Sequence, residues 1–428
     1  MSTTTDTQVA SGSPAVARPT NAFGAYLLEN VVRRNGILLA FVVVIIALSF
    51  WQKQFLSPSN LTNLVLQYSY VLILALGMLM IIVLAQIDLS VGSVVAFTGA
   101  VAAVVVVRHG MPWYFGVAAA LVTGLAVGAW QGFWVAVIGI PGFIVTLGGQ
   151  LLFRGLAQLT LQYVSLSPFN KLPSGQAYYD ISNGFIKGVF PAFTVNVDLW
   201  FIHWHTGEID VFTVVVLAIA VVGYAIAQWR SRAARLQYQQ EVAPKPLFIG
   251  QIVLVAVVAM FYAWRISQNR GLPVILIILA VFILVYGMVM GRTSFGRGVY
   301  AIGGNLLAAQ LSGVKTKWIT FWAFVNMGFL AGVAGVIFSA RMNSAQPAAG
   351  VGMELDAIAA CFIGGASTTG GIGRIGGAMI GGLIMAVISN GMQLAGLSQG
   401  IQPVIKGLIL TLAVAFDLWN KRRTSVAA

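Results

Sequence analysis

Long apolar runs limit this chain to few folds. Eleven of them reach about 18 residues, the length that a helix needs to cross a bilayer, and a shorter run makes a twelfth. Only 8% of the 428 residues are charged, against about a quarter in a soluble chain. We therefore predict an all-α fold, a polytopic membrane helical bundle of about 12 membrane segments, one of them short. The predicted segments are 36–52, 64–85, 91–107, 113–138, 143–162, 209–229, 247–264, 273–290, 318–339, 375–393, 402–419 and the short 355–367.

The two ends of the chain differ from this apolar body. Residues 1–35 are rich in Ser, Thr, Ala and Pro, and they show no small-residue cleavage pattern behind a short hydrophobic core. We predict a disordered cytoplasmic tail there and not a signal peptide. Residues 36–423 form the predicted transmembrane domain, and 424–428 a second cytoplasmic tail. The single cysteine, Cys361, excludes a disulfide framework or a thiolate metal site built from this chain alone.

The net charge of +13 is compared first with the positive-inside rule of membrane proteins. If the N-terminus is inside and all twelve segments cross, the inside loops carry 15 basic residues and the outside loops 7, with Arg154 and Lys406 within segments. A re-entrant dip at 355–367 would instead place the basic C-terminal stretch NKRRTS outside. We therefore predict twelve crossings with both termini in the cytoplasm.

Three hydrophilic stretches interrupt the segments. Residues 163–208 are rich in aromatic, Pro, Gly and Asn residues, which favours an ordered external loop that meets a ligand or partner; an amphipathic segment in the headgroup layer is an equal alternative. Residues 230–246 form a basic cytoplasmic linker. Residues 291–317 contain a basic start, a Gly-Gly-Asn turn and the run LLAAQLSG, which is too short to span and favours a cytoplasmic docking helix.

An internal repeat is suggested by AQIDLSVGSVVAF at 85–97 and MELDAIAACFIGG at 353–365. Each places an acid before small and apolar residues, and each is followed by glycines at four-residue spacing. An odd number of crossings separates the copies, which predicts an inverted repeat of the kind found in transporters. Glycines at this spacing favour close helix packing over ligand contact. The two ladders are Gly124, Gly128 and Gly132, and Gly373, Gly377 and Gly381.

Three acids lie close to apolar segments, and ionisable groups at membrane depth tend to mark a transport path. Asp88, with the nearby Ser90, and the pair Glu354 and Asp356 are therefore candidate residues of a translocation route. The alternative is that these carboxylates cap helix N-termini. Asn343 and Gln346 lie in the polar stretch ARMNSAQPAAG and are further route candidates for a neutral polar solute, although a solvated loop is equally compatible with that stretch.

Enzyme signatures are lacking in the sequence. It contains no GxxxxGK[ST] phosphate loop, no HExxH and no GxSxG. His203 and His205 have no third metal ligand beside them, so we predict neither a metal site nor a cofactor. An intramembrane aspartyl protease stays open as an alternative, because Asp88 and Asp356 would form its dyad if they met across the repeat.

Five motifs together resemble the permease subunit of bacterial monosaccharide ABC importers, with the xylose-type permeases most similar and the ribose and galactose types sharing the motifs. The resemblance covers about residues 36–423. Its motifs are QIDLSVGS at 86–93, PGFIVTLGGQLLFRG at 141–155, GRTSFGRGVYAIGGNLLAAQLSGVKT at 291–316, ARMNSAQPAAGVGMELDAIAACFIGGASTTGGIGRIGG at 340–377 and NGMQLAGL at 390–397.

The resemblance implies a multi-pass protein of the bacterial inner membrane that is not itself an enzyme. It implies a second permease copy, a periplasmic sugar-binding protein and a cytoplasmic ATPase with two nucleotide-binding domains as partners. The segment 303–313 would dock on that ATPase. The residues expected to couple to it are Gly303, Gly304, Asn305, Ala308, Ala309, Ser312 and Gly313.

Two features differ from parts of this family. The segments 209–229 and 247–264 are additional to the shorter ribose-type permeases, and Gln86 stands where xylose-type members commonly carry an acid. We predict a permease that moves xylose or a related aldose by alternating access. A proton-coupled secondary sugar transporter that uses Asp88 and Asp356 as a relay is the alternative within transport.

Overall fold

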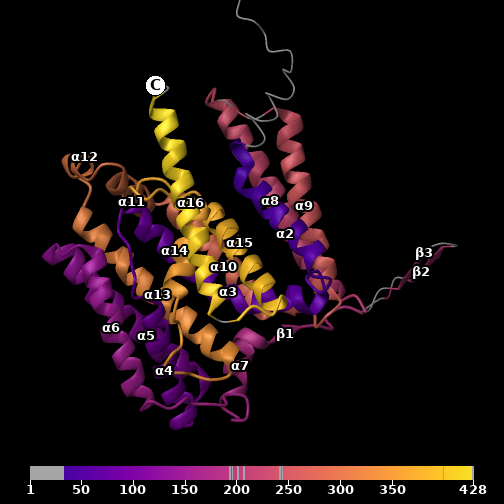
Figure 1. The fold of residues 1–428 in the computed structure, drawn as a ribbon, viewed down its shortest axis with the longest axis horizontal. Coiled ribbons are helices and arrows are strands. Elements are labelled where there is room, and N and C mark those ends of the chain that lie inside the picture. The colour runs from indigo at the N-terminus through magenta and orange to yellow at the C-terminus, as the bar shows by residue number, and fades with distance from the viewer. Residues whose placement is uncertain are drawn as a thin grey trace, which may run out of the picture.

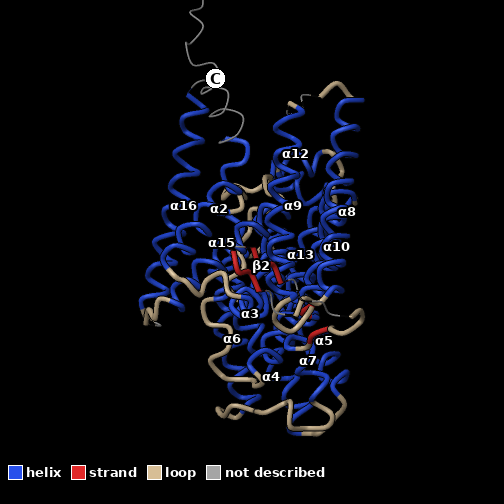
Figure 2. The backbone as a smooth tube through the Cα atoms, turned by 90° about the vertical axis from the view of Figure 1, so that its right-hand side faces the viewer, coloured by secondary structure: helices blue, strands red, loops and turns tan. Residues whose placement is uncertain are grey.

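Over the residues that it describes, the computed structural model is a bundle of helices with four short strands (Figures 1 and 2). The structure describes residues 33–426 apart from 192, 193, 195, 200, 201, 206, 207, 241, 243 and 399. Each of the twelve predicted membrane segments coincides with a helix, so the predicted fold class is confirmed. These helices are α2 (Arg33–Trp51), α3 (Pro58–Val83), α4 (Val91–Ala103), α5 (Trp113–Gly132), α6 (Gly142–Leu161), α8 (Val211–Gln237), α9 (Lys245–Ser267), α10 (Val274–Arg292), α13 (Thr316–Met342), α14 (Met353–Ile363), α15 (Ile375–Leu394) and α16 (Ile401–Val426).

Two of these helices continue through wider, π-helical turns. The turn η2 (Val104–Arg108) extends α4, and η3 (Phe133–Ile138) extends α5. Counted with these turns, nine helices of the described chain are long and apolar enough to cross a membrane. The short helix α14 has 11 residues and is about 16 Å long, roughly half of a hydrocarbon core.

Helix α3 forms the centre of the bundle. Every residue from Tyr68 to Val83 is buried, which fits a helix that is apolar all round. Its neighbours include α9, α10, α13, α14 and α15. The pair α8 and α9 is the opposite case, because few of their residues are buried and α8 packs chiefly on α9 at the edge of the bundle (Figure 1).

The segment before α8 contains a short helix and three short strands. Helix α7 (Gln176–Asn183) packs against α13, where the hydroxyls of Tyr178 and Ser339 are 2.7 Å apart. Strand β1 (Phe185–Ile186) pairs antiparallel with β4 (Leu272–Pro273), just before α10. Strands β2 (Asn196–Leu199) and β3 (Ile202–His205) pair with each other. The described side chains near α7 therefore hold this segment against the bundle.

Three helix boundaries in the structure differ from those predicted from the sequence. Helix α8 runs to Gln237, so the first half of the stretch 230–246 is helical and only 238–244 connects α8 to α9. Helix α16 continues to Val426, past the predicted start of a tail at 424. Helix α2 already begins at Arg33, inside the predicted N-terminal tail, and the rest of that tail lies outside the described residues. Apolar pattern marks the core of a helix better than its polar ends.

Candidate translocation route and docking segment

Two segments enter the bundle as non-helical chain and continue as a helix. The first is 84–90, which follows α3 and leads into α4. Its start lies beside the last turn of α3, because the amide of Gly371 donates to the carbonyl of Val83 at 2.9 Å. Its end lies deeper, because Gly92 is packed against Gly350 and Glu354.

The second segment is 343–374, and it runs in the opposite sense. Asn343 lies at the α7 end of the bundle, where its side chain accepts from the amides of Phe169 and Asn170 at 2.9 and 3.1 Å. Gly373 lies at the other end, where its carbonyl accepts from the Tyr300 hydroxyl at 2.8 Å. Although α14 alone is too short, the whole segment passes from one end to the other, as the predicted crossing requires.

The N-terminal ends of α4 and α14 meet inside the bundle. A β-carbon on Gly92 would lie 2.1 Å from the carbonyl oxygen of Gly350 and 2.3 Å from Glu354 Oε2. Two helices of opposite direction thus present their positive dipole ends to one region that holds buried carboxylates. This arrangement agrees with the predicted inverted repeat, in which broken helices meet near the middle of the membrane.

Asp88 lies in the non-helical part of the first crossing and is buried. Its carboxylate accepts from the amide of Ser90 at 2.8 Å and from the Ser90 hydroxyl at 2.7 Å. The Ser90 hydroxyl in turn accepts from the amide side chain of Gln131 on α5. Both bonds from Ser90 go to Oδ1 of Asp88, and they fix the turn that leads into α4.

The expectation that the acids are N-cap residues is wrong in detail. Ser90 is the N-cap residue of α4, and Asp88 binds the turn before it. Gly352 is the N-cap residue of α14, while Glu354 and Asp356 lie within its first turn. The carboxylates still lie beside helix N-termini, where the helix dipole favours negative charge.

Asn343 and Gln346 do not join the buried acids. Asn343 ends α13 in a left-handed conformation and also donates to the side chain of Asn170 at 2.9 Å. Gln346 donates to the Ser344 hydroxyl at 3.2 Å. Asn343 therefore attaches the α7 segment to α13, which is a structural use of its amide.

Asp356 has a partner that sequence reasoning missed. Lys406 on α16 donates to Asp356 Oδ2 at 2.9 Å, and the two side chains keep 24% and 15% of their surface exposed, Lys406 the larger share. The sequence signal was a lone lysine inside an apolar run. Arg154 on α6 is a second basic residue of this kind, and it donates to the carbonyls of Pro347 and Ala349.

The predicted docking stretch forms two helices at the end of the bundle where α16 also ends (Figure 1). Helix α11 (Ser294–Gly304) begins at the N-cap Thr293, whose hydroxyl accepts from the amide of Gly296 at 3.1 Å. Helix α12 (Leu306–Leu311) begins at Asn305, whose side chain accepts from the amide of Ala308 at 2.9 Å. Burial raises the pKa of Tyr300, which binds α11 to the Gly373 loop, above its ordinary value.

The seven predicted coupling residues divide into two groups. Gly304, Asn305, Ala308, Ser312 and Gly313 are exposed. Ala309 is buried, and Gly303 is packed so that a β-carbon would lie 1.7 Å from the Val83 carbonyl oxygen. Both residues pack within the protein, and Ala309 offers almost no surface to a partner. The large apolar residues exposed on α12 are Leu306, Leu307 and Leu311, the last at 82%.

The glycine ladders lie at helix contacts, with one shift. Gly124, Gly128 and Gly132 on α5 face the backbone of α13. Gly377 and Gly381 on α15 face the backbone of α14, while Gly373 lies before α15 in a loop against α3. Gly382 also packs on α3, against Leu72. The predicted ladders therefore do not have equivalent neighbours, and the face of α15 turned toward α3 was missed.

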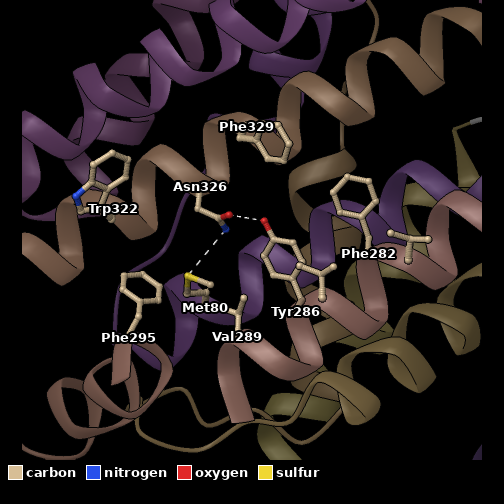
Figure 3. A pocket seen from close by; sticks show the side chains of 10 residues that line it. Met80, Phe282, Tyr286, Val289, Phe295, Trp322, Asn326 and Phe329 are labelled. Atoms are coloured by element: carbon tan, nitrogen blue, oxygen red, sulfur yellow. Dashed lines mark hydrogen bonds between the residues drawn. The ribbon is translucent and has the colours of Figure 1, made fainter. Parts of the chain in front are cut away.

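The described part of the bundle also contains a groove and a smaller cavity. A groove of about 590 Å³ between α3, α10, α11 and α13 is lined mainly by aromatic and aliphatic side chains, and Figure 3 shows Tyr286 and Asn326 hydrogen-bonded to each other in it. A cavity of about 190 Å³ lies between α14, α15 and α16 and includes Asp356 and Lys406. The side chains of His203 and His205 lie outside the described part of the chain.

Comparison with known proteins agrees with the family resemblance. The family described as branched-chain amino acid transport system / permease component matches residues 60–414. The xylose transport system permease protein XylH of Escherichia coli is 37% identical over 393 residues, 91% of this chain and 92% of that protein. XylH of Haemophilus influenzae is 36% identical over 402 residues, 93% of this chain and 100% of that protein.

A ribose permease is similar over nearly the same length. The ribose import permease protein RbsC of Escherichia coli is 34% identical over 388 residues, 90% of this chain and 93% of that protein. No solved structure matches the chain. The predicted resemblance is confirmed, and the chain belongs to the sugar ABC transporter permease family that includes these xylose and ribose permeases.

Proposed function

We propose that this protein is the membrane subunit of an ATP-driven monosaccharide importer in the bacterial inner membrane, with both termini in the cytoplasm. Xylose or a related aldose is the proposed substrate, since the xylose permeases match at 36–37% identity and the ribose permease of E. coli at 34%. The permease would act with a second copy of itself and a periplasmic sugar-binding protein.

The exposed leucines of α12 carry the proposal. Leu307 and Leu311 keep 66% and 82% of their surface exposed on a short helix outside the apolar bundle. Exposed apolar side chains grouped on one element mark a protein interface. Because the chain has no phosphate-binding loop of its own, the natural partner at this surface is a separate ATPase.

Charge supports the orientation. Arg297 lies on α11, Arg292 precedes it and Lys315 and Lys317 follow α12. Arg374 lies in the loop before α15, beside α11. An excess of basic residues marks the cytoplasmic side of a membrane protein. The docking helices and the ATP supply would then lie on the same side.

The broken crossings supply the moving part. Helices that end inside the membrane can shift as units when neighbouring helices rearrange, and they surround the route in many transporters. ATP-driven movement of α12 would pass through α11 to Gly303 and Gly371, which are packed against Val83 at the start of the first broken crossing. Alternating access is the proposed mechanism.

The protease and the proton-coupled transporter, the two alternative functions, would need arrangements that differ from the one described. A protease dyad needs carboxylates that share a proton, but Asp88 binds Ser90 and Asp356 binds Lys406. A proton-coupled transporter would not need the α12 surface.

Uptake of radiolabelled D-xylose by proteoliposomes that contain the permease, the ATPase and the binding protein distinguishes ATP-driven from proton-driven transport. We expect uptake only when ATP is supplied on the side of the membrane where the ATPase is bound. Uptake driven by a proton gradient without ATP would contradict the proposal.

A further inference from the structure

The cavity between α14, α15 and α16 has the composition of a site for a polar neutral molecule. Its polar lining consists of Asp356, Lys406 and Gln402, and its apolar lining includes Leu355 and Met385. The larger groove of Figure 3 is different, because its central Tyr286 and Asn326 already bind each other among apolar side chains. Of these two hollows, the smaller one has charged groups of both signs in its lining.

The ion pair between Asp356 and Lys406 lies among apolar segments, where a charge that faced lipid would be unfavourable in free energy. Lys406 lies in the second turn of α16, within the apolar stretch Ile401–Leu412, and Asp356 lies in the first turn of the short helix α14. Both side chains stay partly exposed. Charged groups at membrane depth face a water-filled cavity or a protein partner and not hydrocarbon. The geometry therefore places water or a polar ligand in this cavity.

Several hydrogen-bonding positions remain open in the cavity. Within the described residues, Asp356 uses Oδ2 for Lys406 and has no partner at Oδ1. Lys406 carries three donors and uses one of them on Asp356. Gln402 donates through Nε2 to the carbonyl of Leu397 at 3.1 Å, which leaves its Oε1 as an acceptor. Open donors and acceptors in one place match the hydroxyl groups of a sugar, each of which both donates and accepts.

Size and net charge agree with a single sugar ring. The volume of about 190 Å³ is below the roughly 300–1,000 Å³ of pockets for drug-sized ligands. The carboxylate and the ammonium cancel, so a neutral ligand meets no net charge. We propose that Asp356, Lys406 and Gln402 form a monosaccharide subsite in the translocation route, an inference that rests on the proposed sugar transport.

Cysteine labelling in the assembled transporter tests this subsite. Gln402→Cys and Leu355→Cys are made in a Cys361→Ala background, and each permease is placed with its ATPase in lipid nanodiscs. A charged, membrane-impermeant methanethiosulfonate is the probe, and D-xylose, D-ribose and D-galactose are titrated as competitors. Leu408→Cys is the control, since Leu408 is 60% exposed on α16 but does not line the cavity.

We expect both cavity positions to react and the lipid-facing control to react far more slowly. A sugar that binds should slow labelling about tenfold at roughly ten times its dissociation constant, because the rate follows the unoccupied fraction. Absence of labelling at 402 and 355, labelling as fast at 408, or no protection by any of the three sugars would overturn the subsite.

The result is separable from the uptake experiment. Uptake with ATP but no sugar protection removes the subsite and leaves the proposed function standing. Sugar protection without ATP-dependent uptake supports the subsite and removes the proposed energy source. If Cys361→Ala lowers the folded yield, the same variants are made in the native chain, where the fully buried Cys361 supplies the baseline rate.

Discussion

Gly92 and Gly350 touch backbone to backbone where the broken helices α4 and α14 begin. A β-carbon on Gly92 would lie 2.1 Å from the Gly350 carbonyl oxygen, and one on Gly350 would lie 2.0 Å from the Gly92 carbonyl oxygen. The contact is reciprocal and involves rigid backbone on both sides. Neither position can accept a side chain without a shift of a whole helix end.

Substitution of Gly92 by alanine is therefore expected to destabilise the protein by about 1–3 kcal/mol, the usual cost of overpacking. The measurement is the apparent melting temperature of purified permease, followed by loss of the monodisperse peak on size-exclusion chromatography. Gly148→Ala on α6 is the matched control, because nothing lies within 4 Å of a β-carbon there. Equal melting temperatures for the two variants would contradict the close contact.

The seam between α14 and α15 gives a second prediction. A β-carbon on Gly381 would lie 2.1 Å from the Ala360 carbonyl oxygen, whereas one on Gly376 in the same helix meets nothing within 4 Å. Gly381→Ala should lower the melting temperature and the transport rate because it separates the two helices. Gly376→Ala should keep both values or raise stability slightly, since alanine favours helix. The reverse order would show that this seam does not limit packing.

The α12 surface gives a prediction about partner binding. Leu311→Asp should abolish co-purification of the ATPase, because it puts a charge into the proposed apolar contact. Membrane insertion and the melting temperature should stay unchanged, since Leu311 is 82% exposed. Gln310→Ala, an exposed neighbour, is the control. Normal ATPase binding by the Leu311→Asp permease would remove α12 from the docking surface.

The N-cap residue of α12, Asn305, allows the position of this helix to be tested apart from its contact with the ATPase. Asn305→Ala removes the bond to the Ala308 amide, which should cost α12 about 1 kcal/mol of helix stability. ATP hydrolysis should continue while uptake per ATP falls, because α12 then transmits movement poorly. Asn305→Asp keeps a capping oxygen and should restore the ratio. A ratio of uptake to hydrolysis that stays at the native value in the alanine variant would show that the cap is not needed for coupling.

Variants of the ion pair between Asp356 and Lys406 are expected to affect stability and transport differently. Either Asp356→Asn or Lys406→Gln alone leaves a partly buried charge without its partner, so each should lower the melting temperature. The double variant should regain much of that stability. Sugar uptake should stay impaired in the double variant if the charges bind the sugar hydroxyls. Full recovery of uptake in the double variant would assign the pair to stability alone.

Most of the bundle could be predicted from the sequence because hydrophobicity sets it. Every membrane segment from 36–52 to 402–419 is a helix, since a lipid-embedded chain must satisfy its own backbone hydrogen bonds. The short run at 355–367 and the docking run LLAAQLSG are also helical, as α14 and α12. These are local properties of apolar length and interrupting polar residues.

The candidate site was predictable only in part. The acids Asp88, Glu354 and Asp356 stand out in an apolar chain, and the structure places all three beside helix N-termini. Ser90 is a local partner of Asp88, but the bond from Gln131 to Ser90 and the bond from Lys406 to Asp356 depend on which helices lie together. The same holds for Ala309, which the sequence placed on a docking surface and the structure buries.

The sequence by itself determined the twelve apolar segments that form helices and their order, because chain composition and the bilayer act on each segment separately. The tertiary structure alone decided that the non-helical segments 84–90 and 343–352 enter the bundle from opposite ends and that Gly92 meets Gly350 there. It also decided that Lys406 reaches Asp356 across 50 residues of sequence. These contacts depend on the fit of distant surfaces, which no local pattern records.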